Sequence, residues 1–310
     1  MPTFATPEPI TATFDLPVAA DVRVTAGERD DTVVTVTPRT PDKAADVRQA
    51  EQTTVEHVGD RVLVRAARHW SQWSPFGGHG AIDVVVELPA GSRVEGDLAM
   101  GRITGEGDLG ACQLKTAMGD IHLATTGALG VKTSHGDITV DRVRGDVDAA
   151  TSSGHIRIAA VEGGAVIRSS HGDTAIGEIT GAVRLKTARG DVRVDRAHAP
   201  VSARSAHGDI SVGRAGASVS AKTSHGDVRV GSVRQGSTVM ETSAGEIEVG
   251  IPEGVAAWLD VRSSHGVVRN SLDEADGPAS SEGTVEVRAR TAVGDIVILR
   301  APAEPAPPAP

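Results

Sequence analysis

The sequence predicts an all-β protein: a β-solenoid of stacked two-strand coils, about 18 residues to the coil, with an N-terminal β cap. Three observations carry this prediction. A short unit recurs along most of the chain, its apolar residues alternate, and the composition suits a thin core. The 310 residues include 36 glycines but only three Phe, three Trp and no Tyr, which favours narrow aliphatic packing.

The recurring unit reads apolar-x-apolar-x-Thr/Ser-Ser/Ala-x-Gly-Asp-Val/Ile-x-Val/Ile, and its clearest copy runs from Val219 to Val230. Ten copies follow one another with spacings of 17, 18, 18, 18, 18, 18, 19, 21 and 28 residues. A fainter copy at Gly101 starts the series. Their turn glycines are Gly119, Gly136, Gly154, Gly172, Gly190, Gly208, Gly226, Gly245, Gly266 and Gly294.

Each unit is expected to hold two short strands and two turns. Apolar residues alternate before and after the glycine, as in Val183 and Leu185 and then Val192 and Val194, a period typical of strands. The Gly-Asp pair suits a tight bend. An antiparallel meander would also fit two strands and two turns into each repeat. The constant repeat length favours coils, in which like residues stack about 4.8 Å apart. The Thr or Ser three positions before each glycine would then form a hydroxyl ladder.

Residues 1–95 lack the period and are expected to form the β cap, which covers an otherwise unpaired strand edge. A charged, Ala-rich stretch from Asp42 to Gln52 is the one expected helical turn or two. The cap strands are expected at Ile10 to Leu16, Asp21 to Thr25, Thr32 to Thr37, Arg61 to Arg65 and Ile82 to Leu88.

The solenoid array is expected over 96–300, interrupted by a polar insertion at 268–284 that closes its C-terminal end. Residues 301–310 are rich in proline and alanine and are expected to be a disordered, extended tail.

Charge and targeting signals narrow the function classes. Lys and Arg number 31 and Asp and Glu 41, a net charge of −10, which argues against general binding of nucleic acid or anionic membranes. Neither a secretory signal nor a membrane span is visible, so a cytoplasmic location is expected. The single cysteine, Cys112, occupies an apolar position and is expected to be buried and unreactive.

A His-Gly-Asp edge is the main candidate for chemistry. His precedes the turn glycine in five copies, and Asp follows it in most of them. Such an edge could bind a divalent metal or respond to protons, but residues strung in a line do not converge on one ion, so solvated turns are the favoured interpretation. The candidate residues are His135, Asp137, His171, Asp173, His207, Asp209, His225 and Asp227; His265 is the fifth histidine.

Catalysis is not expected, and neither is a cofactor. Ser134, His135 and Asp137 are the residue types of a hydrolase triad, but neighbouring strand residues point to opposite faces and cannot assemble one.

A basic row is expected four residues before the glycines, either offset by the acidic turns or open to an acidic partner. Its members are Lys115, Lys132, Arg168, Lys186, Arg204, Lys222, Arg262 and Arg290.

Half of the aromatic residues fall within one short loop between His69 and His79. Trp70, Trp73 and Phe76 would form a recognition tip for a sugar or a protein if exposed, or would plug the junction between cap and array if buried. Burial is the favoured interpretation.

The repeated Lys/Arg-Thr-Ser/Ala-x-Gly-Asp-Val/Ile-x-Val unit, Val84 to Gly91 before the array, and Ile251 to Asp260 near its end together resemble the DUF4097, or Toastrack, family of β-strand-repeat proteins, common in actinobacteria. The resemblance implies a stacked β fold and an adhesin-like role with ties to envelope or stress signalling; it carries over no catalytic residues. The sequence thus predicts a non-enzymatic repeat scaffold that presents an extended surface to unknown protein partners, with self-association possible. The alternative is a ligand- or metal-binding module that uses the His-Gly-Asp edge.

Overall fold

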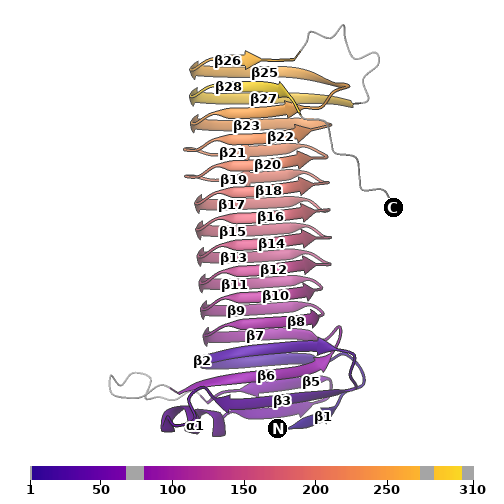
Figure 1. The fold of residues 1–310 in the computed structure, drawn as a ribbon, viewed down its shortest axis with the longest axis vertical. Helices are drawn as coiled ribbons and strands as arrows, with labels where there is room; N and C mark the ends of the chain where they lie inside the picture. The colour runs from indigo at the N-terminus through magenta and orange to yellow at the C-terminus, as the bar shows by residue number, and fades with distance from the viewer. Residues whose placement is uncertain (1, 68–79, 273–282, 302–310) are drawn as a thin grey trace. The chain divides into compact units, whose positions relative to one another are not determined.

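The computed structural model describes residues 2–67, 80–272 and 283–301 and divides into two units, Met1–Ala159 and Ala160–Pro310, each built of β-solenoid coils (Figure 1). The first unit begins with an N-terminal part that is less regular than its later coils. Its elements are β1 (Thr3–Ala5), β2 (Thr11–Gly27), β3 (Asp31–Pro38), α1 (Ala44–Glu51), β4 (Thr54–Val58), β5 (Arg61–Arg65) and β6 (Ala81–Pro89).

Regular coils of the first unit start at β7. These strands are β7 (Arg93–Met100), β8 (Ile103–Asp108), β9 (Cys112–Met118), β10 (Ile121–Thr126), β11 (Leu129–His135), β12 (Ile138–Val143), β13 (Val147–Ser153) and β14 (Ile156–Val161), the last of which spans the division between the units.

The second unit is built on the same pattern of alternating short strands and turns. Its strands are β15 (Ala165–His171), β16 (Thr174–Ile179), β17 (Val183–Arg189), β18 (Val192–Ala197), β19 (Val201–Arg204), β20 (Ile210–Ala215), β21 (Val219–Lys222), β22 (Val228–Val233), β23 (Gly236–Ala244), β24 (Ile247–Ile251), β25 (Val255–His265), β26 (Val268–Asn270), β27 (Gly283–Val293) and β28 (Ile296–Arg300).

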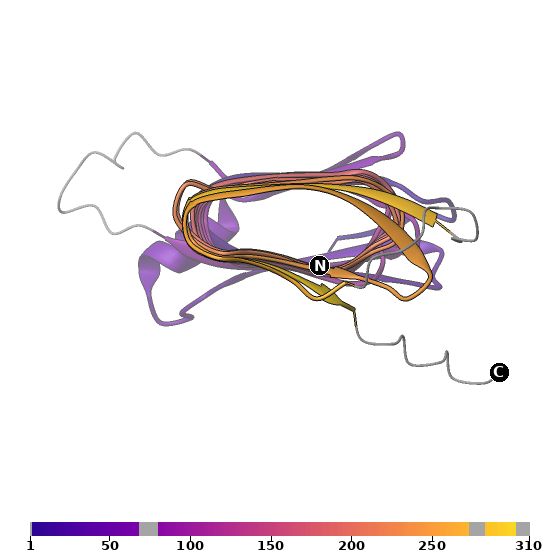
Figure 2. The same cartoon turned by 90° about the horizontal axis from the view of Figure 1, so that it is seen from above.

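Each regular coil gives one strand to each of two parallel sheets, seen end-on in Figure 2 as a flattened loop. β9 pairs with β11 and β10 with β12, so that Leu114 lies opposite Val131 and Ile121 opposite Ile138. These inward side chains are at most 2% exposed. The alternation in the sequence therefore produces the thin aliphatic core that the low aromatic content predicted.

The turn glycines form a column because neighbouring coils approach too closely there for a side chain. Gly208 has φ +137°, and a Cβ on it would lie 2.2 Å from the carbonyl oxygen of Gly190. Gly119 in the first unit has φ +139° and the same relation to Gly101, at 1.9 Å. Only glycine meets both requirements, the left-handed backbone and the contact.

Strand β2 joins the less regular N-terminal part to the regular coils of the first unit. It pairs in parallel with β7 and β8 on one side and with β5 and β6 on the other. The sequence predicted two separate strands here, but β2 is a single strand. Its pairing with β7 continues through a register shift between Leu16 and Ala19. The expected helix is confirmed as α1.

The stacking order at the C-terminal end differs from the chain order. β27 pairs with β23 on one side and with β25 on the other, and β28 lies in the same way between β24 and β26. The coil of Gly294 thus lies between those of Gly245 and Gly266. The expected insertion at 268–284 is partly strand, since β26 and the start of β27 fall within it; residues 273–282 lie outside the described part. The division into cap, array and tail at residues 95 and 300 stays a proposal.

Candidate functional site

The candidate histidines lie at exposed turn positions, and in the second unit they share a column with an arginine. Parallel bridges connect Arg189 to His207 and His207 to His225. The rings of His207 and His225 stack with their centroids 4.9 Å apart and their planes 2° from parallel. His171 lies opposite Arg189. The structure therefore brings two of the predicted histidines together in this unit, with Arg189 between them and His171.

The aspartates of the same turns hold neighbouring coils together. Asp209 Oδ1 accepts a hydrogen bond from the Asp227 N–H at 2.8 Å. In the same way Asp191 accepts the Asp209 N–H and Asp173 accepts the Asp191 N–H, both at 2.9 Å. In the first unit Asp137 accepts the His155 N–H at 2.7 Å. Each carboxylate thus satisfies a backbone donor that the turn would otherwise leave to water. This bonding gives the Asp of the repeated Gly-Asp a structural role.

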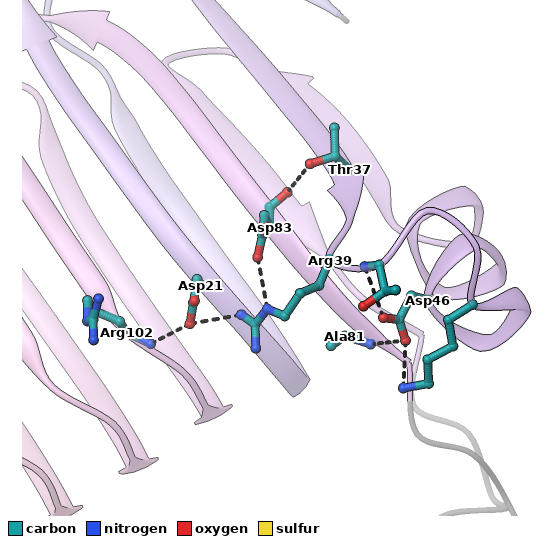
Figure 3. A network of polar contacts seen from close by, with 9 residues as sticks. Asp21, Thr37, Arg39, Asp46, Ala81, Asp83 and Arg102 are labelled. Carbon is teal, nitrogen blue, oxygen red and sulfur yellow. Dashed lines mark hydrogen bonds and ion pairs between the residues drawn. The ribbon is translucent and has the colours of Figure 1, made fainter.

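In the N-terminal part, an aspartate outside the repeat accepts the same kind of backbone hydrogen bond. Asp21 Oδ1 accepts the Arg102 N–H at 2.9 Å, at the turn between β7 and β8 (Figure 3). Arg39 connects Asp21 to Asp83, with nitrogen–oxygen distances of 2.9 and 3.1 Å. Sequence reasoning missed Asp21 because no glycine precedes it.

In the same view, Asp46 connects α1 to the start of β6. Its side chain is 1% exposed and accepts hydrogen bonds from the Ala81 N–H at 3.0 Å and the Thr40 N–H at 3.2 Å, while Lys43 Nζ lies 3.0 Å away. Burial alone would raise the pKa of Asp46, but these donors outweigh it and hold that pKa below its ordinary value.

A metal centre would need several ligands that converge on one point. Within residues 2–67, 80–272 and 283–301, no group of three or more His, Cys, Asp or Glu side chains is placed to share an ion. Cys112 is fully buried, and burial raises the pKa of its thiol to about 11, so the thiol stays protonated at neutral pH.

Those hydroxyls of the predicted ladder that are hydrogen-bonded donate to carbonyl oxygens and not to each other. Thr223 Oγ1 donates to the Gly208 carbonyl at 3.1 Å and Thr291 Oγ1 to that of Gly245 at 3.1 Å. Four other hydroxyls of the ladder are buried without a hydrogen-bond partner among the described residues: Thr133, Thr151, Ser169 and Thr187.

The basic row is continuous over four coils of the second unit. Arg168 lies opposite Lys186, Lys186 opposite Arg204, and Arg204 opposite Lys222. The row ends at Glu241, which pairs with Lys222 at 2.8 Å.

Two of the turn aspartates form ion pairs with arginines outside the row. Asp227 pairs with Arg229 and Asp137 with Arg157, neither of which belongs to the row. Lys186 and Arg204 are exposed and have no ion pair with any described residue. Between the two interpretations of the row, this arrangement favours an open basic surface.

A groove of about 740 Å³ crosses the opposite sheet of the second unit, lined among others by Arg196, His198, Arg214 and Glu248. At its rim Glu178 accepts hydrogen bonds from His198 at 2.8 Å and Arg196 at 3.3 Å, and the His198 bond contributes most to lowering the pKa of Glu178. Sequence reasoning missed this groove. Gly213 and Gly231, which lie against each other in its lining, were the available signal.

Trp70, Trp73 and Phe76, the predicted recognition loop, lie outside the described residues. Across the described ranges, no helix is both long and apolar enough to cross a lipid bilayer.

Several solved structures are similar to this chain at low sequence identity. A candidate adhesin from Parabacteroides merdae is 12% identical, with 80% of this chain and 94% of that chain covered and a TM-score of 0.39. A candidate adhesin from Bacteroides fragilis is also 12% identical, with 96% of this chain and 95% of that chain covered and a TM-score of 0.30. A candidate lipid-binding protein from Parabacteroides distasonis is 12% identical, with 95% of each chain covered and a TM-score of 0.34. Similarity this low says nothing about function.

No curated protein matches the chain. The sequence profile of the Toastrack family, DUF4097, matches residues 13–238, which is more than half of the sequence. Together with the stacked coils, the glycine column and the repeated Gly-Asp turns, this match shows that the chain belongs to the Toastrack DUF4097 family.

Proposed function

We propose that the chain is a non-enzymatic repeat scaffold that binds an acidic protein segment along the basic row of its second unit. The observation that carries the proposal is the set of adjacent cations Arg168, Lys186, Arg204 and Lys222, of which Lys186 and Arg204 have no counter-charge among the described residues. Like charges stacked at strand spacing repel one another, so an acidic segment laid across them would relieve the repulsion.

The parallel register suits an extended partner. Because each coil presents its cation at the same position, the row offers regular sites about 4.8 Å apart. Binding of this kind depends on repetition and needs no enclosed pocket. The turn residues beside the row are already engaged in coil-to-coil bonds, which supports a structural role for them and a binding role for the row.

The test measures fluorescence anisotropy with labelled poly-L-glutamate as the acidic probe. Lys186→Ser with Arg204→Ser is expected to weaken binding roughly three- to tenfold, since each exposed ion pair contributes up to about 1 kcal/mol. Added salt should weaken wild-type binding as well. Arg23→Ser with Arg93→Ser removes two exposed charges outside the row and should leave binding unchanged.

Equal losses in the two double variants, or no binding by the wild type, would contradict the proposal. The alternative, a metal-binding module at the His-Gly-Asp edge, is tested by calorimetry with zinc, calcium and nickel. Submicromolar metal binding that His171→Ala with His207→Ala abolishes would support the metal-binding module over the scaffold.

A further inference from the structure

The final coil of the second unit has an open strand edge. β25 pairs with β27 along one edge, from Val255 opposite Gly283 to His265 opposite Val293. Along its other edge no strand of the described residues pairs with it. Figure 1 shows β25 and β26 beyond β27 and β28 at this end. Such an edge presents a row of backbone donors and acceptors to any strand that can pair with it.

The edge also leaves apolar surface partly uncovered. Leu259 and Val261 occupy inward positions, yet they are only half-buried, whereas Val287 and Ala289 opposite them are 0% exposed. On the outward face of the same strand, Trp258 is 57% exposed. Pairing with a further strand would cover both the backbone edge and these side chains.

The charges on the strand indicate which strand fits. Asp260 and Arg262 are two residues apart on the outward face. Arg262 lies opposite Arg290 in β27, a like charge, and has no ion pair with any described residue; Asp260 contacts Arg290 at 3.3 Å. A strand running antiparallel to β25 with an acid opposite Arg262 and a base opposite Asp260 would complete the pattern.

We propose that this strand is β25 of a second copy, paired antiparallel about a two-fold axis through Val261. In an antiparallel pair of identical strands, the inward side chains of both copies lie on the same face only if the numbers of two opposite residues add to an even sum. Centring the axis on Val261 meets this condition, because opposite residues are then equally far from residue 261. Asp260 of each copy then faces Arg262 of the other, so the dyad produces two ion pairs. This isologous contact joins the open ends of two copies and is independent of the basic row.

The test is a charge swap followed by sedimentation velocity. Wild-type protein dimerises. Asp260→Arg places two arginines opposite each other and Arg262→Asp two aspartates, so each single variant should weaken the dimer about tenfold or more. An equimolar mixture of the two variants restores both ion pairs in a heterodimer and should regain wild-type affinity. Arg184→Asp, an exposed reversal on β17, serves as the control and should dimerise normally.

Disulfide trapping tests the register without relying on charge. Val261→Cys should form an intermolecular disulfide with its own symmetry mate, and Ser263→Cys, which faces Leu259, should not. A wild-type chain that stays monomeric at high concentration overturns the proposal. So does a dimer that both single variants leave intact, or trapping at residue 263 in preference to 261.

Discussion

At the scale of single residues, the turn aspartates explain why the repeat ends in Gly-Asp. The glycine permits the close approach of two coils, and the aspartate then bonds the backbone of the coil it meets. Asp209 is typical: its carboxylate accepts the Asp227 N–H, while its own N–H donates to Asp191. An acceptor oxygen is required for this role, but a charge is not.

Substitutions at Asp209 separate a structural from a charge-dependent role. Asp209→Ala should lower the free energy of unfolding by about 1 kcal/mol, because the Asp227 N–H loses its protein acceptor. Asp209→Asn keeps an oxygen and should cost less than about 0.5 kcal/mol. Urea denaturation measures both, with Asp195→Ala as the control, since Asp195 pairs with Arg193 of its own strand. Equal damage from Asn and Ala would show that the charge itself matters.

At the scale of an element, α1 depends on one buried carboxylate. The helix is eight residues long, too short to be stable by itself. It packs on the cap because Asp46 accepts the backbone N–H of Ala81 at the start of β6 and lies beside Lys43. The ionised form of Asp46 makes these contacts best, so the attachment of the helix should depend on pH.

Asp46→Asn should lower the free energy of unfolding at neutral pH by about 1–3 kcal/mol, the range for hydrogen bonds to a charged group. The pKa of Asp46 is lowered in the folded protein, so its stabilisation is complete above the unfolded value of about 3.9 and is lost as the pH falls through the folded value. The difference between wild type and variant should therefore shrink in acid. The control is Asp42→Asn, an exposed neighbour; a difference that persists in strong acid would contradict this account.

At the scale of the whole molecule, the sequence predicted what the repeat itself determines. The coil length, the inward apolar residues and the glycine column all follow from local patterns, such as Val183 and Leu185 before Gly190. Local patterns could not predict the order of the last two coils, because the copies at Gly266 and Gly294 both match the repeat and neither records which coil it pairs with. Their order depends on which coil forms better contacts with β23 and β24.

The candidate site was predictable to the same extent. The basic row and the histidine column follow from the repeat, but the partners of the turn Asp carboxylates lie on other coils, 17 to 28 residues away in the chain. The hydrogen bonds from backbone N–H groups to the turn carboxylates could not be predicted for that reason. Asp21 could not be found, because it lies outside the period altogether.

The central claim is that equivalent residues of successive coils lie side by side. Paired cysteines test it most directly. Ser202 and Ser220 lie opposite each other on β19 and β21, where a parallel pair is close enough for a disulfide. Ser211 is nearer to Ser202 in the sequence but lies on β20, in the other sheet. Under mild oxidation, Ser202→Cys with Ser220→Cys should form an intramolecular disulfide and Ser202→Cys with Ser211→Cys should not; the reverse result would contradict the stacked coils.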